Sequence, residues 1–166
     1  NAEGNSVSNT LQYTFNEDGT TVSVAKQGEN AVSGDVVIPG TVEYKGKSYS
    51  VTSIGECAFQ SCSKLTSVTF AKNSQLKSIG DSAFAHCSSL TSIEIPEGVK
   101  TIGKGAFAYC FKLTSVTIPS SVESIGQYAF VGCSALMSVD FAKNSQLKSI
   151  GDSAFAHVSN AFKLAV

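Results

Sequence analysis

The sequence predicts an α/β repeat solenoid in which each coil contains a short strand and a short helical turn. Three observations support this fold class. A motif recurs every 23 to 25 residues, each copy contains a segment in which apolar and polar residues alternate, and the first fifty or so residues follow a different, hairpin-like pattern. We therefore expect about five stacked coils behind an N-terminal β-hairpin cap.

Each repeat begins with an Ile-Gly dipeptide, followed four residues after the isoleucine by Ala-Phe. Successive isoleucines are separated by 25, 23, 23 and 25 residues. Cysteine follows the phenylalanine by three residues in four copies, and leucine follows the cysteine by three. The segment FAKNSQLKSIGDSAFAH occurs identically at 70–86 and 141–157, three repeats apart. Because two equivalent coils share it, we expect this segment to meet only the general demands of stacking and to hold no unique site. The repeated isoleucines are Ile54, Ile79, Ile102, Ile125 and Ile150.

Two elements are expected within each repeat. The pattern L-x-x-V-x-I alternates and is rich in β-branched residues, which favours a short strand. In the segment 80–86, Ala83, Phe84 and the following Cys87 have helical spacing, and Gly-Asp stands where a helix N-cap belongs. This segment is therefore predicted to form a helical turn with one buried face.

The N-terminal part departs from the repeat. Leu11 to Phe15 and Thr21 to Val24 alternate around Glu17-Asp18-Gly19, which predicts a hairpin, and 44–49 predicts a second hairpin turning at 45–47. Residues 1–9 are polar and unpatterned, so we expect them to be loose. The predicted division is a flexible N-terminus and β cap with the first strand over residues 1–52, and one continuous solenoid over residues 53–166.

The C-terminal repeat is also atypical. Val158 replaces the cysteine and Ala161 replaces the leucine of the motif. Two interpretations stay open: Phe162, Leu164 and Val166 close the core as an apolar plug, or the array was truncated here and once continued.

Composition excludes several classes of function. The chain has 166 residues, of which 42% are hydrophobic, so it can form a substantial core. Charged residues make up only 15% and the net charge is −1, which gives no electrostatic basis for binding nucleic acid. No apolar run approaches the roughly 20 residues of a membrane helix, so we expect no membrane insertion by this segment.

The cysteines do not predict a metal site. Equivalent residues of stacked coils lie about 4.7 to 4.9 Å apart, so four cysteines should form a row that cannot converge on one zinc ion. Parallel side chains at that spacing also disfavour disulfides, and buried free thiols are the simpler interpretation. Cys57 stands outside the row and is expected to be the more exposed thiol. The row consists of Cys62, Cys87, Cys110 and Cys133.

No catalytic site is predicted. Gly80-Asp81-Ser82 has the form of a strained nucleophile turn, but other repeats place unrelated residues in the same slot. His86 and His157 are the only histidines and are three coils apart, or about 14 Å, so they cannot share a metal ion or a proton. We expect a non-enzymatic protein that needs no cofactor.

The outward side chains of the strands form the predicted ligand-binding face. Solenoids of this kind bind partners on an extended strand face, which is concave in horseshoe-shaped members. If an aromatic site exists instead, the candidates are Tyr13, Tyr44, Tyr49, Tyr109 and Phe111. The predicted face is rich in hydroxyl groups and consists of Thr66, Ser67, Thr69, Thr91, Ser92, Glu94, Thr114, Ser115, Thr117, Met137, Ser138 and Asp140.

With motifs such as IGECAFQSCSKLTSVTF and IGKGAFAYCFKLTSVTIP, the chain resembles the BspA-like leucine-rich-repeat family of bacterial surface proteins from Val36 to His157. The resemblance implies leucine-rich repeats of 23–25 residues. It also implies an extracellular or cell-surface location on a bacterium, with the signal or anchor outside this sequence, and adhesion to a host matrix protein or a cell-surface protein. The alternative is a glycan-binding or envelope-scaffold module of a larger surface assembly.

Overall fold

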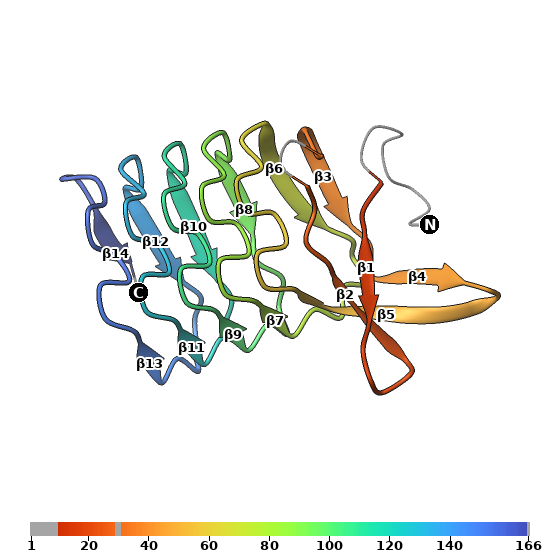
Figure 1. Ribbon diagram of the computed structural model, residues 1–166. Coiled ribbons are helices and arrows are strands. Elements are labelled where there is room, and N and C mark those ends of the chain that lie inside the picture. The colour runs from red at the N-terminus through yellow and green to blue at the C-terminus, as the bar shows by residue number, and fades with distance from the viewer. Residues whose placement is uncertain (1–9, 29–30, 166) are drawn as a thin grey trace.

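The computed structural model describes residues 10–28 and 31–165. The N-terminal segment predicted to be loose and Val166 of the predicted plug lie outside the described residues. The described residues form a solenoid of strands and turns, with the N-terminal hairpins at one end and the last coil at the other (Figure 1). They include no helix that is long and apolar enough to cross a membrane.

Two sheets run along the solenoid. The first has the order β1-β2-β5-β7-β9-β11-β13, with β4 paired to β5, and the second has the order β14-β12-β10-β8-β6-β3. The first sheet consists of β1 (Tyr13–Phe15), β2 (Thr21–Val24), β4 (Thr41–Tyr44), β5 (Lys47–Ile54), β7 (Ser78–Ile79), β9 (Thr101–Ile102), β11 (Ser124–Ile125) and β13 (Ser149–Ile150). The second consists of β3 (Gly34–Ile38), β6 (Leu65–Phe70), β8 (Ser92–Glu94), β10 (Ser115–Ile118), β12 (Ser138–Phe141) and β14 (Lys163–Ala165).

The solenoid has about six coils, so the prediction of about five was wrong. The second sheet contains six parallel strands, one for each coil. The first, β3, precedes the hairpin that interrupts the repeat, and the last, β14, lacks the motif leucine. Backbone pairing nevertheless places β14 in register, with Val139 opposite Leu164. Ladder pairing needs only backbone groups, so a coil can form where the side-chain motif has lapsed.

The predicted helical turn is also wrong, because the described residues contain no helix and the fold is therefore not α/β. In the turn after Ile-Gly, every second backbone N–H donates to a carbonyl of the next coil. The Phe59 N–H donates to the Ala83 carbonyl at 2.7 Å, and the Ser61 N–H donates to the Ala85 carbonyl at 2.8 Å. These bonds replace the i to i−4 bonds of a helix. Two residues in each of these turns also have positive φ, as at Ser82 (55°) and His86 (60°), which a right-handed helix does not contain.

The supposed N-cap has a different role. The Asp81 Oδ1 accepts a hydrogen bond at 2.8 Å from the backbone N–H of Lys104, which belongs to the next coil. The side chain therefore links two coils and does not cap a helix within its own coil.

A row of phenylalanine rings forms the centre of the core. Phe59, Phe84, Phe107 and Phe130 are fully buried, and neighbouring rings stack with centroids 5.1 to 5.2 Å apart. Phe155 continues the row at 5.5 Å from Phe130. The ring spacing follows the coil spacing, so the Ala-Phe motif predicted from the repeat is what aligns the coils.

The glycine of Ile-Gly permits the coils to approach closely. A Cβ at Gly126 would lie 2.6 Å from the Gly103 carbonyl carbon and the Lys104 nitrogen of the preceding coil. Any larger residue would push two backbones apart, which explains why the dipeptide recurs in each repeat.

Both predicted N-terminal hairpins are confirmed. Strands β1 and β2 pair antiparallel, and so do β4 and β5. The second hairpin turns at Lys45 and Gly46, which have φ of 49° and 76° and so match the left-handed requirement of a tight hairpin turn. Figure 1 shows this hairpin extending away from the stacked coils.

Candidate binding surfaces

The outer face of the second sheet brings together the residues predicted to bind a ligand. Its register places Ser67, Ser92, Ser115 and Ser138 opposite one another on successive strands. Thr117 likewise lies between Glu94 and Asp140. We call this surface the strand face; it comprises the twelve residues predicted above together with Asp35, Val37 and Lys163.

The serine row of the strand face has opposite charges at its two ends. Asp35 pairs with Ser67 at the N-terminal end, where its Oδ1 accepts a 2.6 Å hydrogen bond from the Ser67 hydroxyl. Lys163 pairs with Ser138 at the C-terminal end. Sequence reasoning did not include Asp35 and Lys163, because their strands lie outside the regular motif.

A shallow hollow lies in the middle of the strand face. It has a volume of about 350 Å³ and spans strands β6, β8 and β10. Thr69, Ser92, Glu94, Ser115 and Thr117 contribute polar side chains to its lining. These five were all predicted from the sequence, and the structure gathers them at one place with a carboxylate in their midst.

The other predicted residues lie around this hollow. Thr66, Thr91 and Thr114 are exposed near the beginnings of their strands, and Met137 is 53% exposed just before β12. Ser67 and Ser138 are half-buried, and Asp140 is exposed. The face is therefore mostly hydroxyl groups, with acidic groups along its length and one exposed apolar side chain toward each end, Val37 and Met137.

A second concave surface lies on the turns between the sheets. Each turn presents two residues of positive φ, separated by four positions, whose side chains border a row of small apolar residues. Between the two borders, Ala85, Ala108 and Val131 are buried and pack with Ala156. The first border consists of Cys57, Ser82, Gly105, Tyr128 and Ser153, and the second of Ser61, His86, Tyr109, Gly132 and His157.

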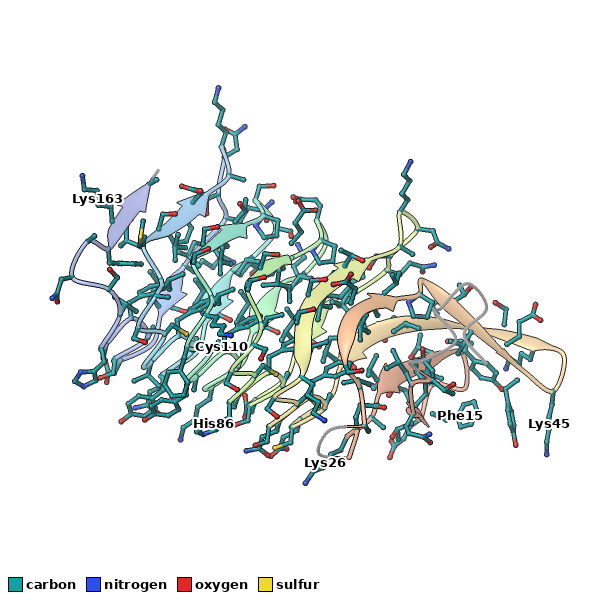
Figure 2. All side chains as sticks on the ribbon, turned by 90° about the horizontal axis from the view of Figure 1, so that it is seen from above. Phe15, Lys26, Lys45, His86, Cys110 and Lys163 are labelled. Carbon is teal, nitrogen blue, oxygen red and sulfur yellow. The ribbon has the colours of Figure 1, made fainter. Side chains whose placement is uncertain are left out.

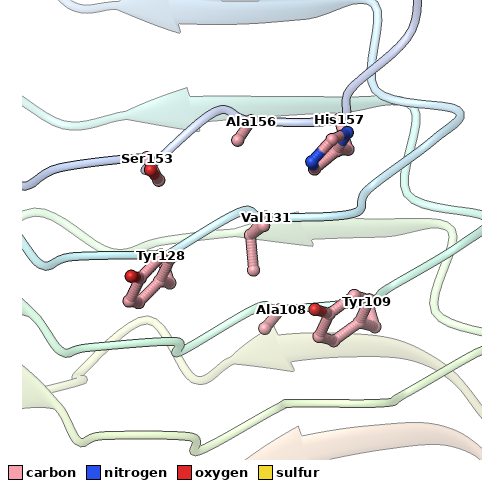
Figure 3. A pocket seen from close by; sticks show the side chains of 7 residues that line it. All are labelled: Ala108, Tyr109, Tyr128, Val131, Ser153, Ala156 and His157. Atoms are coloured by element: carbon pink, nitrogen blue, oxygen red, sulfur yellow. The ribbon is translucent and has the colours of Figure 1, made fainter.

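Over its last three turns, this second surface, here called the turn groove, holds a pocket (Figure 3). Its volume there is about 440 Å³. Tyr109 and Tyr128 are each 40% exposed on opposite borders, and Phe111 lies beyond Tyr109 with ring centroids 6.2 Å apart. Tyr109 and Phe111 are among the aromatic candidates predicted from the sequence, whereas Tyr128 and His157 are not. Tyr128 and His157 occupy the same repeat positions as other residues of the two borders, and this regularity could have indicated them. The expectation of a helix placed these positions on the wrong backbone and so hid the relationship.

The remaining aromatic candidates belong to the N-terminal hairpins. Tyr44 and Tyr49 both pack on Phe15, with ring centroids 5.2 and 4.9 Å apart. Lys45 and Lys47 lie over the Tyr44 and Tyr49 rings respectively. Tyr13 is half-buried against the core, and burial raises its pKa to about 12.

The cysteine row is buried and none of its four thiols forms a disulfide. The Cys87, Cys110 and Cys133 thiols each donate to the backbone carbonyl of a phenylalanine in the preceding coil, at 3.1, 3.2 and 3.0 Å. Burial raises the pKa of Cys87 to about 12. The Cys87 thiol therefore stays protonated, and all three thiols act as core residues with one weak donor each. Cys57 is half-buried, as expected for the residue outside the row.

The two histidines lie on the turn groove in equivalent slots of different coils. His86 stacks on Tyr109 with ring centroids 4.9 Å apart (Figure 2 labels His86). His157 lines the pocket of the groove, on the far side of Gly132. Over residues 10–28 and 31–165, no three His, Cys, Asp or Glu side chains come together as a metal site requires.

Comparisons with known proteins agree with this architecture. The BspA type Leucine rich repeat region matches residues 46–162 in six copies. No curated protein matches the sequence significantly. Among solved structures, the leucine-rich repeat protein of T. pallidum has 29% identity and a TM-score of 0.76, over 88% of this chain and 64% of that one.

Two other solved structures extend the comparison. A leucine rich cell surface protein of Faecalibacterium prausnitzii has 26% identity and a TM-score of 0.52, over 99% of this chain and 55% of that one. The pneumococcal vaccine antigen PcpA shares the fold, with 20% identity and a TM-score of 0.69 over 96% of this chain and 45% of that one. The chain thus spans at most about two thirds of these proteins, and no catalytic family is indicated. With six matched repeats over most of its length, the chain belongs to the BspA-type leucine-rich-repeat family.

Proposed function

We propose that this chain is a non-enzymatic interaction module that binds a protein ligand through the strand face. The observation that carries the proposal is the continuous polar surface across six parallel strands, with a hollow of about 350 Å³ around Glu94. Membership of a family that includes bacterial cell-surface proteins supports an extracellular location and a role in adhesion to host or neighbouring-cell proteins.

The chemistry of the strand face favours a polar, basic segment of the partner. Hydroxyl groups can donate and accept hydrogen bonds, so the serine and threonine rows can pair with a backbone or with polar side chains. Asp35, Glu94 and Asp140 give the surface a negative character along most of its length. Complementary charge chiefly raises the association rate and fixes the register, whereas the hollow supplies the contact area.

The rigidity of the strand face is a second argument. Its strands are paired on both sides from β6 to β12, and the side chains beneath them are buried. A partner therefore meets a surface that is already ordered, which lowers the entropic cost of association.

Binding of the purified chain to immobilised matrix proteins tests the proposal. The informative variant is Glu94→Lys with Asp140→Lys, because both side chains are exposed and their reversal leaves the core intact. We expect the double variant to lose binding and the wild-type interaction to weaken with added salt. Lys72→Glu with Lys143→Glu, which alters exposed charges of the loops outside the strands, is the matched control and should bind normally.

Unchanged binding in the double variant would exclude the strand face. If the wild-type chain binds no matrix protein but binds in a glycan array, the alternative of a glycan-binding module replaces the present proposal.

A further inference from the structure

The turn groove is a second surface that the proposed function does not use. The pocket in its last three turns is lined by three rings, a serine and three small apolar side chains. Figure 3 shows the small side chains in a line between the two borders, with Tyr128 on one side and Tyr109 and His157 on the other. We propose that this groove binds a proline-rich protein segment in the polyproline II conformation.

The row of rings on one border is interrupted in the groove. His86 and Tyr109 stack at 4.9 Å, but the next slot holds Gly132 and the one after it holds His157. A Cβ at Gly132 would overlap the Tyr109 ring, so this coil has no side chain in the row. The Tyr109 ring therefore lies over Gly132, and no side chain of this row separates it from His157, so both rings line the same pocket.

The spacing of the groove matches the repeat of a polyproline II helix. Tyr109 and His157 belong to coils two steps apart, and twice the 4.9 Å ring spacing is about 9.8 Å. A polyproline II helix has three residues per turn and rises about 3.1 Å per residue, or about 9.3 Å per turn. Residues i and i+3 of such a ligand therefore meet Tyr109 and His157, which line the pocket two coils apart.

The polarity of the groove fits the same ligand. None of the 7 residues that line it is Asp, Glu, Lys or Arg, which favours a neutral segment. Ala108, Val131 and Ala156 provide the apolar floor for prolyl rings. The polyproline II backbone has no internal hydrogen bonds, so its carbonyls need external donors. The hydroxyls of Tyr109, Tyr128 and Ser153 are available on the borders.

Aromatic rings along a groove are a general way to bind such segments, because the extended ligand is already ordered and loses little entropy. A neutral saccharide is the principal competitor, since it also stacks on tyrosine. The match between the spacing of two coils and one turn of a polyproline II helix favours the peptide, and the experiment distinguishes the peptide from the saccharide.

The chain supplies conservative variants for the test. Tyr109→Ser and Tyr128→Ser place in the groove the residue that the same borders hold at Ser61 and Ser82, with φ of 60° and 55°. Both substitutions are therefore compatible with the turn. The duplicated 17-residue segment provides a matched pair: His157 lines the groove, whereas His86 lies on the far side of Tyr109 in an identical local sequence.

The measurement is fluorescence anisotropy of a labelled peptide of about four Pro-Pro-Ala triplets, titrated with the full chain, with a Gly-Ser peptide of equal length as control. We expect binding of the proline peptide only. Each tyrosine variant should weaken it about fivefold and the double variant about thirtyfold, from the usual contribution of one aromatic contact. His157→Ala should also weaken it, whereas His86→Ala should change it by less than about twofold.

Three results would overturn the proposal: no binding of the proline peptide by the wild-type chain, equal binding of the Gly-Ser peptide, or binding within about twofold of wild type in the double tyrosine variant. Binding of a neutral N-acetylglucosamine trisaccharide without binding of the peptide would assign the groove to glycans. None of these outcomes depends on the strand face, so this test and that of the proposed function can fail separately.

Discussion

Substitution of one ring in the phenylalanine row should destabilise the protein according to the position of its coil. Phe107 is fully buried and stacks on Phe84 and Phe130 with centroids 5.2 and 5.1 Å away. Phe107→Ala leaves a cavity between two coils and removes both stacking contacts. Large-to-small substitutions of buried phenylalanine cost about 3 to 5 kcal/mol, and we expect about 4 kcal/mol here.

The terminal ring is a graded comparison. Phe155 is only partly buried in the last coil, although it stacks on Phe130 and Phe162 at 5.5 and 5.4 Å. Phe155→Ala should cost about 2 kcal/mol or less, because terminal coils of a solenoid have one neighbour to lose and can fray separately. Phe111→Ala, at an exposed ring of the same coil as Phe107, should change stability by no more than about 0.5 kcal/mol.

Urea unfolding followed by circular dichroism gives the free energies, and amide hydrogen exchange shows which coils open. Phe107→Ala should lower protection throughout the solenoid, and Phe155→Ala only in the last coil. If the two substitutions cost the same, or if the effect of Phe107→Ala is confined to its own coil, the reasoning that stacked rings hold the coils together is refuted.

Three further predictions follow from the contacts. Under native conditions at pH 8, Cys57 should react with a thiol reagent while the row reacts only on unfolding, because its four side chains are buried and burial also raises the pKa of Cys87 to about 12; rapid labelling of the row would contradict its burial. Hydrogen bonds from the Thr21 hydroxyl and nearby backbone N–H groups lower the pKa of Asp18 from 3.8 to about 2. The stabilisation of the first hairpin by the ionised Asp18 carboxylate is therefore complete above pH 3.8 and is lost as the pH falls through 2. The amide resonances of this hairpin should shift with that midpoint, and Asp18→Asn should abolish the transition. Gly126→Ala should cost more than about 2 kcal/mol in urea unfolding, whereas Gly28→Ala, whose added Cβ would be 3.8 Å from its nearest neighbour, should be nearly neutral.

The sequence predicted the parts of this fold that depend on repetition. The period identified the stacking, the alternation of residues such as Val116 and Thr117 identified the strands, and the Ala-Phe slot identified the buried rings. Each of these signals is local and occurs several times. The two hairpins were also predictable, because their turns require residues that favour positive φ or tight bends.

The conformation of the turns could not be read from the sequence. The spacing of Ala83, Phe84 and Cys87 suits a helix, but the N–H groups of this segment and its neighbours bond to carbonyls one coil away. Whether the segment forms a helix or an extended turn depends on the adjacent coil, which supplies a carbonyl acceptor in register for every second residue. A local pattern does not reveal such a partner, and the same limitation concealed the turn groove.

The repeat, the buried rows and the hydroxyl-rich strand face follow from the amino-acid sequence alone, because each depends on side-chain type at a fixed interval. The number of coils, the helix-free turns and the neighbours of Gly132 emerge only in the folded chain, because backbone pairing between coils, rather than any single repeat, sets the distances across them.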